Sequence, residues 1–197
     1  DQFGGNIYVT GLSANIVDNT SYYLGTADSG VGIYAYGSST FPTTIENNTI
    51  NGARTGIVAT YANVFDNILT DNFYRGLDLN NTTATGNILI GSTTANTGIE
   101  SSNSVIRRNS VTQYNFGMNI VAASSAIDNV VTANRDTGMV VKGASTAVGN
   151  VVRDNPTGIL VQDSGNVLTN NLLDHNTIRG LLVQTNGSPE TLFSNNT

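Results

Sequence analysis

The chain has 197 residues, a formal net charge of −6 at pH 7 and only 11% charged residues. Its few Lys and Arg residues disfavour nucleic acid and anionic membranes as partners. The absence of cysteine excludes disulfides, thiolate metal sites and cysteine nucleophiles. Because no stretch of about 18 apolar residues occurs, we expect no membrane insertion. Asn, Thr, Ser and Gly take the place of charges, which indicates a protein that is secreted or displayed on a cell or virion surface.

In chain order, the first element is a strand-like run at Gly5-Asn6-Ile7-Tyr8-Val9, and similar runs follow at nearly regular intervals. Each later run opens with a glycine and an aliphatic residue, about every 21 residues. These steps are Gly32-Ile33, Gly56-Ile57, Gly76-Leu77, Gly98-Ile99, Gly117-Met118, Gly138-Met139, Gly158-Ile159 and Gly180-Leu181. A tandem period of this length indicates a solenoid. We expect the glycines to supply unusual backbone angles at a tight corner.

A second marker, asparagine, keeps the same period. It occurs at Asn48, Asn67, Asn87, Asn109, Asn129, Asn150 and Asn171. We expect these residues to line another corner, because asparagine tolerates the left-handed conformation and its amide can hydrogen-bond from rung to rung. Residues 37–44 lengthen one repeat, and their Gly, Ser, Pro and Thr content predicts an outward loop.

Each repeat contains two or three short apolar runs, such as Ile57-Val58-Ala59, Val64-Phe65 and Ile68-Leu69. These runs are too short for helices and rich in β-branched residues, so they predict strands. One rung cannot bury its inward side chains alone, but rungs stacked about 4.8 Å apart share a continuous core. We therefore predict an all-β fold: a single parallel β-helix domain over residues 1–197, with eight or nine rungs of about 21 residues.

At Ile45-Glu46-Asn47-Asn48-Thr49-Ile50 and Thr55-Gly56-Ile57 the pattern resembles the pectin-lyase-like β-helix repeats. That family includes polysaccharide lyases, alginate epimerases, phage tailspikes and copper-site accessory proteins of the NosD type. The resemblance covers about residues 30–183 and implies a right-handed parallel β-helix. It is specific for the fold and nearly silent on chemistry, because the repeated residues are those that build the coil.

Residues at one strand position in successive rungs form a column on one face of such a coil. If the residue after each glycine points inward, the next one points outward. Asp78 and Glu100 then lie on adjacent rungs, about 5 Å apart. Two such carboxylates can divide acid and base roles, or hold a Ca²⁺ ion together with amide oxygens. The alternative is a pair of solvated surface acids.

Asp78 and Glu100 are thus the candidate catalytic residues. The candidate substrate-binding residues around them are Asn80, Ser102, Asn119, Tyr34 and Tyr36, with Tyr61 and Tyr74 completing an aromatic rim. No complete lyase or hydrolase set is visible. Lys142 lies two rungs from Glu100, too far to act on the same sugar, and His175, the sole histidine, is typical of a turn. Whether the chain is an enzyme stays open, and we expect no cofactor apart from a possible Ca²⁺ at the acid pair.

A second outward feature is apolar. Val140, Leu160 and Leu182 occupy one column on consecutive rungs, which predicts a partner interface. A covering loop or a register error would explain the same pattern. Both ends of the sequence lack a recognisable cap, so we expect a piece of a larger protein or a subunit that meets other subunits end to end.

Two functions follow. In the first, the chain is an extracellular glycan-facing module that binds a polysaccharide or helps to process it, as a tailspike or lyase does. In the second, it is a structural subunit of a surface fibre or filament, a homo-oligomer assembled through its ends and its apolar column. The groove of acids and amides around Asp78 and Glu100, together with the aromatic rim, favours the first function. The sparse charge, the missing caps and the missing catalytic set favour the second.

Overall fold

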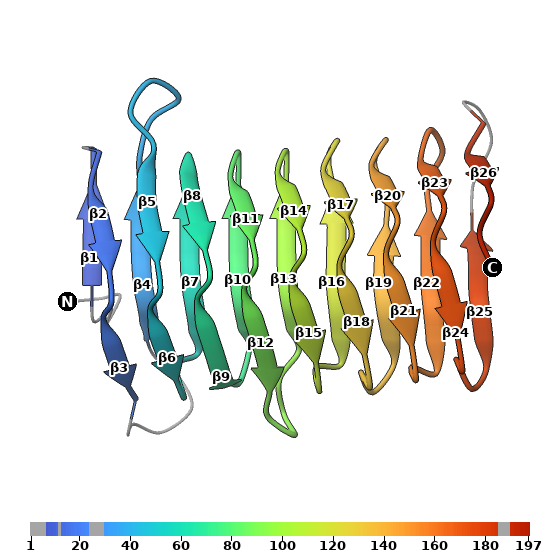
Figure 1. Cartoon of the computed structure of the whole chain (residues 1–197), viewed down its shortest axis with the longest axis horizontal. Coiled ribbons are helices and arrows are strands. Elements are labelled where there is room, and N and C mark those ends of the chain that lie inside the picture. Colours follow the sequence, from blue (N-terminus) through green and yellow to red (C-terminus); the bar gives the residue numbers. More distant parts are fainter. Residues whose placement is uncertain (1–6, 12, 24–29, 185–189) are drawn as a thin grey trace.

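The computed structural model describes residues 7–11, 13–23, 30–184 and 190–197, and every regular element in them is a β-strand. Figure 1 shows the strands stacked in rungs along a rod, with the first rungs at one end and the last at the other. The strands form three parallel sheets, here called A, B and C, so the predicted all-β parallel solenoid is confirmed. Gly5 and Asn6 lie outside the described residues, whereas Ile7 begins β1.

The bounds of the strands follow the repeat. Sheet A contains β1 (Ile7–Thr10), β4 (Val31–Tyr36), β7 (Thr55–Thr60), β10 (Arg75–Asn80), β13 (Thr97–Ser102), β16 (Phe116–Val121), β19 (Thr137–Val141), β22 (Thr157–Gln162) and β25 (Arg179–Gln184). Sheet B contains β2 (Asn15–Val17), β5 (Thr43–Glu46), β8 (Ala62–Phe65), β11 (Thr83–Thr85), β14 (Val105–Arg107), β17 (Ser125–Ile127), β20 (Thr146–Val148), β23 (Val167–Thr169) and β26 (Leu192–Ser194). Sheet C contains β3 (Thr20–Tyr22), β6 (Thr49–Asn51), β9 (Ile68–Asn72), β12 (Ile88–Gly91), β15 (Ser110–Thr112), β18 (Val130–Thr132), β21 (Val151–Arg153) and β24 (Leu172–Asp174).

The core runs through the centre of the rod. Ile57, Leu77 and Ile99 occupy matching positions on successive strands of sheet A and are fully buried. Burial of each such side chain stabilises the fold by about 1.5–3 kcal/mol. Since every rung repeats this contribution, the free energy of folding is spread along the rod and depends on contacts between neighbouring rungs.

The repeated glycines in sheet A do not have the left-handed backbone angles that we expected. Gly98, for example, lacks a positive φ. A Cβ atom added there would lie 2.3 Å from Val111 Cγ1 and 2.5 Å from the carbonyl oxygen of Gly117. The glycine is therefore required by lack of space between sheet A and the core, and its conformational freedom is not used.

The repeated asparagines build the corner between sheets B and C. The rung-to-rung hydrogen bonds are confirmed: the backbone N–H of Asn67 donates to Oδ1 of Asn87 at 3.0 Å, and the Asn67 side chain donates to the same oxygen at 2.9 Å. The left-handed residue, however, is the one before each asparagine, as at Asp66 (φ 51°) and Asp128 (φ 55°). The turn residue thus reverses the chain, while the asparagine points inward and bonds to the neighbouring rungs.

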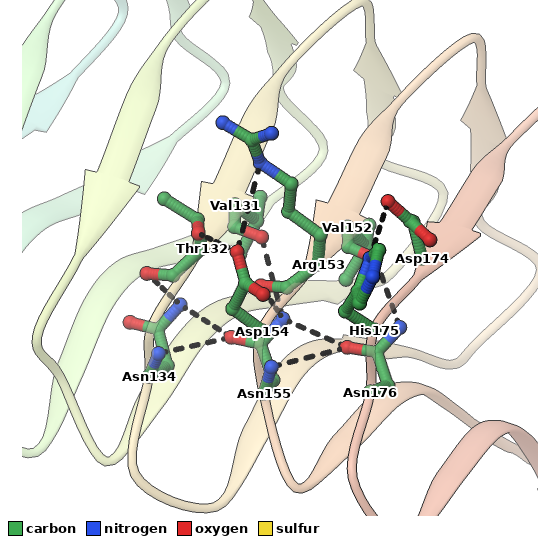
Figure 2. Close-up of polar contacts among 10 residues, drawn as sticks. All are labelled: Val131, Thr132, Asn134, Val152, Arg153, Asp154, Asn155, Asp174, His175 and Asn176. Carbon is green, nitrogen blue, oxygen red and sulfur yellow. Dashed lines mark hydrogen bonds and ion pairs between the residues drawn. The ribbon is translucent and has the colours of Figure 1, made fainter.

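A second amide ladder lines the corner between sheets C and A in the last rungs. Figure 2 shows Asn134, Asn155 and Asn176 in a row. The backbone N–H of Asn134 donates to Asn155 Oδ1 at 2.9 Å, and that of Asn155 to Asn176 Oδ1 at 3.2 Å. Both ladders use the side-chain amide to satisfy buried backbone groups that sheet pairing leaves unpaired at a corner.

The corner between sheets A and B varies in length from rung to rung. The predicted loop at 37–44 is shorter in the structure, because Thr43 and Thr44 belong to β5. Residues 37–42 connect β4 to β5 and project beyond the corners of the other rungs (Figure 1). No helix in the described part of the chain is long and apolar enough to cross a membrane.

Candidate functional site

The outer face of sheet A is a row of residues that runs along the rod, one from each strand. The row consists of Tyr8, Tyr34, Val58, Asp78, Glu100, Asn119, Val140, Leu160 and Leu182. The register places each residue directly beside the next, so side chains far apart in sequence are neighbours along this face. Neighbouring strands lie about 4.8 Å apart.

The two candidate catalytic carboxylates lie side by side, because Asp78 pairs with Glu100 in the register of β10 and β13. Their partners differ. Asp78 accepts a short hydrogen bond from the Arg75 guanidinium within its own strand. Glu100 Oε1 accepts a hydrogen bond of 2.8 Å from the Asn119 amide on the next rung. One carboxylate is therefore balanced by a cation, and the other is oriented by a neutral amide.

Arg75 is held in place from two sides. Its guanidinium lies 4.9 Å from the centre of the Tyr74 ring, and that of Arg54 lies 4.5 Å from the same centre. Burial lowers the pKa of Arg75, but the charges of Asp78 and Glu100 and the hydrogen bond to Asp78 outweigh that effect and raise it. The side chain stays cationic and brings a permanent positive charge beside the two acids.

Arg75 was absent from the sequence-based site, because strict alternation would place it inside. The alternation breaks at the glycine: a Cβ on Gly76 would meet the core atoms Leu89 Cδ2 at 2.5 Å and Tyr114 Oη at 2.9 Å, while Leu77 is also buried. Two consecutive inward positions return Arg75 to the same outer face as Asp78. The glycine that marks each repeat was the available signal.

The aromatic side chains gather on the N-terminal rungs of this face. The rings of Tyr8 and Tyr34 stack with centres 4.9 Å apart and planes 12° apart. Tyr36 meets Tyr61 edge to face, with ring centres 6.4 Å apart. Tyr8 and Tyr36 remain 59% and 45% exposed, which leaves ring surface open to a ligand.

A shallow hollow of about 300 Å³ lies on the same face, next to the acid pair. Its lining combines apolar and polar side chains: Thr97, Phe116, Asn119, Val140, Lys142, Leu160 and Gln162. Oδ1 of Asn119 is buried and has no hydrogen-bond partner within the described residues. An unpaired buried acceptor costs free energy, and this oxygen has almost no surface open to a ligand, so it is an unsatisfied group within the wall of the hollow.

The apolar column predicted from the sequence is less exposed than expected, because part of it lines this hollow. Val140, Leu160 and Leu182 do pair on consecutive strands. Val140, however, is only 7% exposed, and the other two are half-buried. Val140 and Leu160 therefore line a hollow and do not form a projecting surface. Their role as an interface between subunits stays a prediction.

The remaining candidate residues lie at the edge of the face. Asn80 pairs with Ser102 on the neighbouring strand. The next residue in each chain segment bonds back to them: the Asn81 amide donates to Asn80 Oδ1 at 2.9 Å, and the Asn103 amide to Ser102 Oγ at 3.4 Å. These two hydrogen bonds link the outer face of sheet A, at Asn80 and Ser102, to the corner between sheets A and B.

No group of three or more His, Asp or Glu side chains in the described ranges is arranged to hold a metal ion. A Ca²⁺ ion at Asp78 and Glu100 stays a prediction.

His175 lies far along the chain, in the turn after β24, where its Nδ1 lies 2.7 Å from the Asp174 carboxylate (Figure 2). Its side chain is 76% exposed, as expected for a turn residue.

Three parallel sheets, inward amide ladders and a decorated outer face define this chain as a parallel β-helix protein. The family model described as "Right handed beta helix region" matches residues 31–197. The chain belongs to this family. No curated protein matches it significantly in sequence.

Two solved structures resemble the fold. A double mutant of the periplasmic alginate epimerase AlgG matches with a TM-score of 0.65 and 16% identity, over 91% of this chain and 59% of that one. A second structure of the periplasmic alginate epimerase AlgG matches with a TM-score of 0.62 and 16% identity, over 86% of this chain and 55% of that one. The chain therefore spans less than two thirds of the epimerase structures, and the likeness concerns the fold.

Proposed function

We propose that the outer face of sheet A binds a polysaccharide and helps to process it. The observation that carries the proposal is the sequence of groups along one row: open tyrosine rings, the Arg75–Asp78 pair, Glu100 with Asn119, and then the hollow. A rung rises by a distance similar to the length of one sugar in an extended glycan. Consecutive sugars laid along the rod would therefore meet consecutive rungs.

Each part of the row suits a part of a sugar. Tyr8 and Tyr36 offer aromatic surface for the C–H face of a pyranose ring. Glu100 and the ammonium of Lys142 offer charged hydrogen-bonding groups for hydroxyl or carboxylate substituents. Lys142 makes no ion pair within the described residues.

The acid pair gives the proposed processing step. Glu100 is the candidate acid–base group, because Asn119 orients its carboxylate and no cation neutralises it directly. Asp78, paired with Arg75, is the candidate charge-stabilising partner. As the fold neighbours are periplasmic alginate epimerases, we propose that the chain acts outside the cytoplasm, in a secreted or surface-exposed protein, and that alginate is the first substrate to test.

Binding and turnover of alginate, polygalacturonate and uncharged glucans would be measured for the wild type, Glu100→Gln and Asp78→Asn. We expect Glu100→Gln to abolish turnover of the accepted glycan while binding persists, and Asp78→Asn to weaken both. Asp128→Asn is the matched control, because it removes one negative charge at the corner between sheets B and C. Wild-type behaviour of both site variants with every accepted glycan would refute the proposal.

Assembly into a homo-oligomer or filament is the second candidate function, and the apolar hollow at Val140 and Leu160 favours it. Leu160→Lys is expected to dissolve assemblies that form through this face, as seen by analytical ultracentrifugation. An unchanged sedimentation profile would exclude Leu160 from any contact between subunits.

A further inference from the structure

We propose that an uncharged oligosaccharide binds in a second hollow, on the other side of the corner between sheets A and B. This hollow has a volume of about 340 Å³ and lies behind the loop of residues 37–42. That volume is near the lower end of the roughly 300–1,000 Å³ found for small-molecule sites. The proposal does not depend on the function of the outer face of sheet A.

The wall of the hollow is preformed. The loop that carries Ser38, Ser39 and Pro42 closes on itself, since the Ser38 backbone N–H donates to the Phe41 carbonyl at 3.2 Å and the Phe41 N–H to Ser38 Oγ at 3.1 Å. Ser13 Oγ donates to the Pro42 carbonyl at 3.1 Å and ties the loop to the preceding rung. A wall ordered before binding spares the ligand the entropy cost of ordering it.

The floor is made by three successive rungs. Their corner residues Tyr61, Asn81 and Asn103 all adopt left-handed backbone angles, with φ of 50°, 48° and 48°. Left-handed turn residues recur at many corners of this solenoid, so these angles give the floor of the hollow the same tight turn in each of the three rungs. In the next rung the corner lengthens to Ala122 and Ala123, both left-handed, and the hollow ends there.

The polar groups in the hollow are available for a ligand. Asn63 and Thr83 occupy the same register position on β8 and β11, followed by Val105 on β14. Neither the Asn63 amide nor the Thr83 hydroxyl makes a hydrogen bond within the described residues, and both line the hollow. Together with the ring of Tyr61, they supply donors, acceptors and an aromatic surface in one place.

The lining also sets the charge of the ligand. All of its residues are Ser, Pro, Tyr, Ala, Asn, Thr or Val, so no charged side chain takes part. An anionic group such as a uronate or phosphate would lose hydration without gaining a cation. Sugar hydroxyls match amides and hydroxyls in both donor and acceptor character. The hollow therefore suits a neutral hexose unit, such as the end or a branch of a glycan.

The test is an amide chemical-shift titration of the ¹⁵N-labelled chain with cellotetraose, mannotetraose and maltotetraose, and with tetragalacturonate as the charged comparison. We expect at least one neutral tetrasaccharide to shift the amides of Asn63, Thr83 and Asn103, and tetragalacturonate to leave them unchanged. Asn63→Val and Thr83→Val should each lower that affinity by about tenfold, because each removes a direct hydrogen bond.

The variants are matched to the scaffold, since Val105 already occupies this position one rung further on. Their spectra should otherwise remain those of the wild type. Tyr22→Ala, which removes a 67% exposed ring on sheet C, is the control for unspecific aromatic contact. Shifts confined to the outer face of sheet A would overturn the proposal and leave the function of that face standing. No shift with any neutral sugar, equal shifts with tetragalacturonate, or unchanged affinity of both valine variants would also overturn it.

Discussion

The corner between sheets B and C repeats one arrangement along the rod, whereas the corner between sheets A and B changes from rung to rung. At the first corner, Asn109 is 1% exposed and bonds to the asparagines of both neighbouring rungs. At the second, Asn81 and Asn103 are exposed and are followed by a longer turn at Ala122 and Ala123.

The difference shows which positions the scaffold constrains. Buried backbone groups need a partner in every rung, so the inward amide cannot change without leaving a donor or acceptor unpaired. The corner between sheets A and B also has a buried position that bonds from rung to rung, but its residue type changes: the Thr82 N–H donates to Ser104 Oγ at 3.1 Å, and the Ser104 N–H to Ser124 Oγ at 3.1 Å. The exposed turn residues beside this position can bond to water, so the length and the residue type of the turn vary there. The second hollow lies at the corner that is free to vary.

The largest expected effect comes from breaking the constrained corner. Asn109→Ala leaves the buried backbone N–H of Asn87 without its acceptor and removes the side-chain hydrogen bonds of Asn109 to Ala84, Asn87 and Asn129. At about 1–3 kcal/mol for the unpaired N–H and about 1 kcal/mol for each lost hydrogen bond, the free energy of unfolding should fall by about 2–6 kcal/mol, measured by urea denaturation. Asn103→Gly removes an amide from the variable corner and suits its φ of 48°, so we expect a change within about 0.5 kcal/mol. Equal losses for the two variants would contradict the comparison.

A somewhat smaller effect is expected from the sheet A glycines. Gly98→Ala places a Cβ 2.5 Å from the carbonyl oxygen of Gly117, and backbone cannot easily move aside. Overpacking of this kind costs about 1–3 kcal/mol. Gly180→Ala is the matched control, because its Cβ would come no closer than 3.7 Å to Leu173. The midpoint temperature of thermal unfolding should therefore fall in Gly98→Ala and stay the same or rise in Gly180→Ala.

Tyr114 is an inward-facing residue whose hydroxyl group lacks a hydrogen-bond partner within the described residues. Its side chain is fully buried. Tyr114→Phe should leave the free energy of unfolding unchanged or raise it by about 1 kcal/mol. Tyr36→Phe, at a 45% exposed ring, is the control and should change nothing. A clear loss of stability in Tyr114→Phe would reveal a partner for the hydroxyl.

The same residue gives a pH dependence. Burial raises the pKa of Tyr114 far above its ordinary 10.0, with a smaller contribution from the charge of Asp71. The unfolded chain ionises near the ordinary value, so the stabilising contribution is complete below pH 10 and is lost as the pH rises above it. Absorbance of tyrosinate should show one tyrosine that ionises only on unfolding, and this signal should be absent in Tyr114→Phe.

The smallest effect belongs to the exposed turn at His175. The hydrogen bond from His175 to Asp174, and then the charge of Asp174, raise the pKa of the imidazole above 6.5. Because the pKa of His175 is higher in the folded chain, its contact with Asp174 stabilises the fold at a pH below the unfolded-state pKa. This stabilisation disappears as the pH rises through the folded-state pKa. An NMR titration should give a raised pKa in the wild type and the ordinary value in Asp174→Asn. The same titration midpoint in both proteins would exclude the contact drawn in Figure 2.

Much of the fold follows from local pattern. Gly56-Ile57 and Asn67 recur with the period of one rung, and the period fixes which residues stack. Asp78 and Glu100 could be paired from the sequence for this reason, and the register agrees. The physical reason why a glycine or an asparagine is needed at each repeated position could not be obtained from the period. Whether Gly98 is needed for its φ or for space depends on Val111, which belongs to another sheet.

The sequence by itself determined the solenoid, its short stacked strands, and the order of residues along the outer face. These depend on periodicity, and periodicity is a property of the chain alone. Only the tertiary structure decided that Arg75 neutralises Asp78, that Val140 lies in a hollow, and that the loop of residues 37–42 walls a second one. Such contacts depend on how far each side chain reaches across rungs and around corners, and no repeat period specifies that reach.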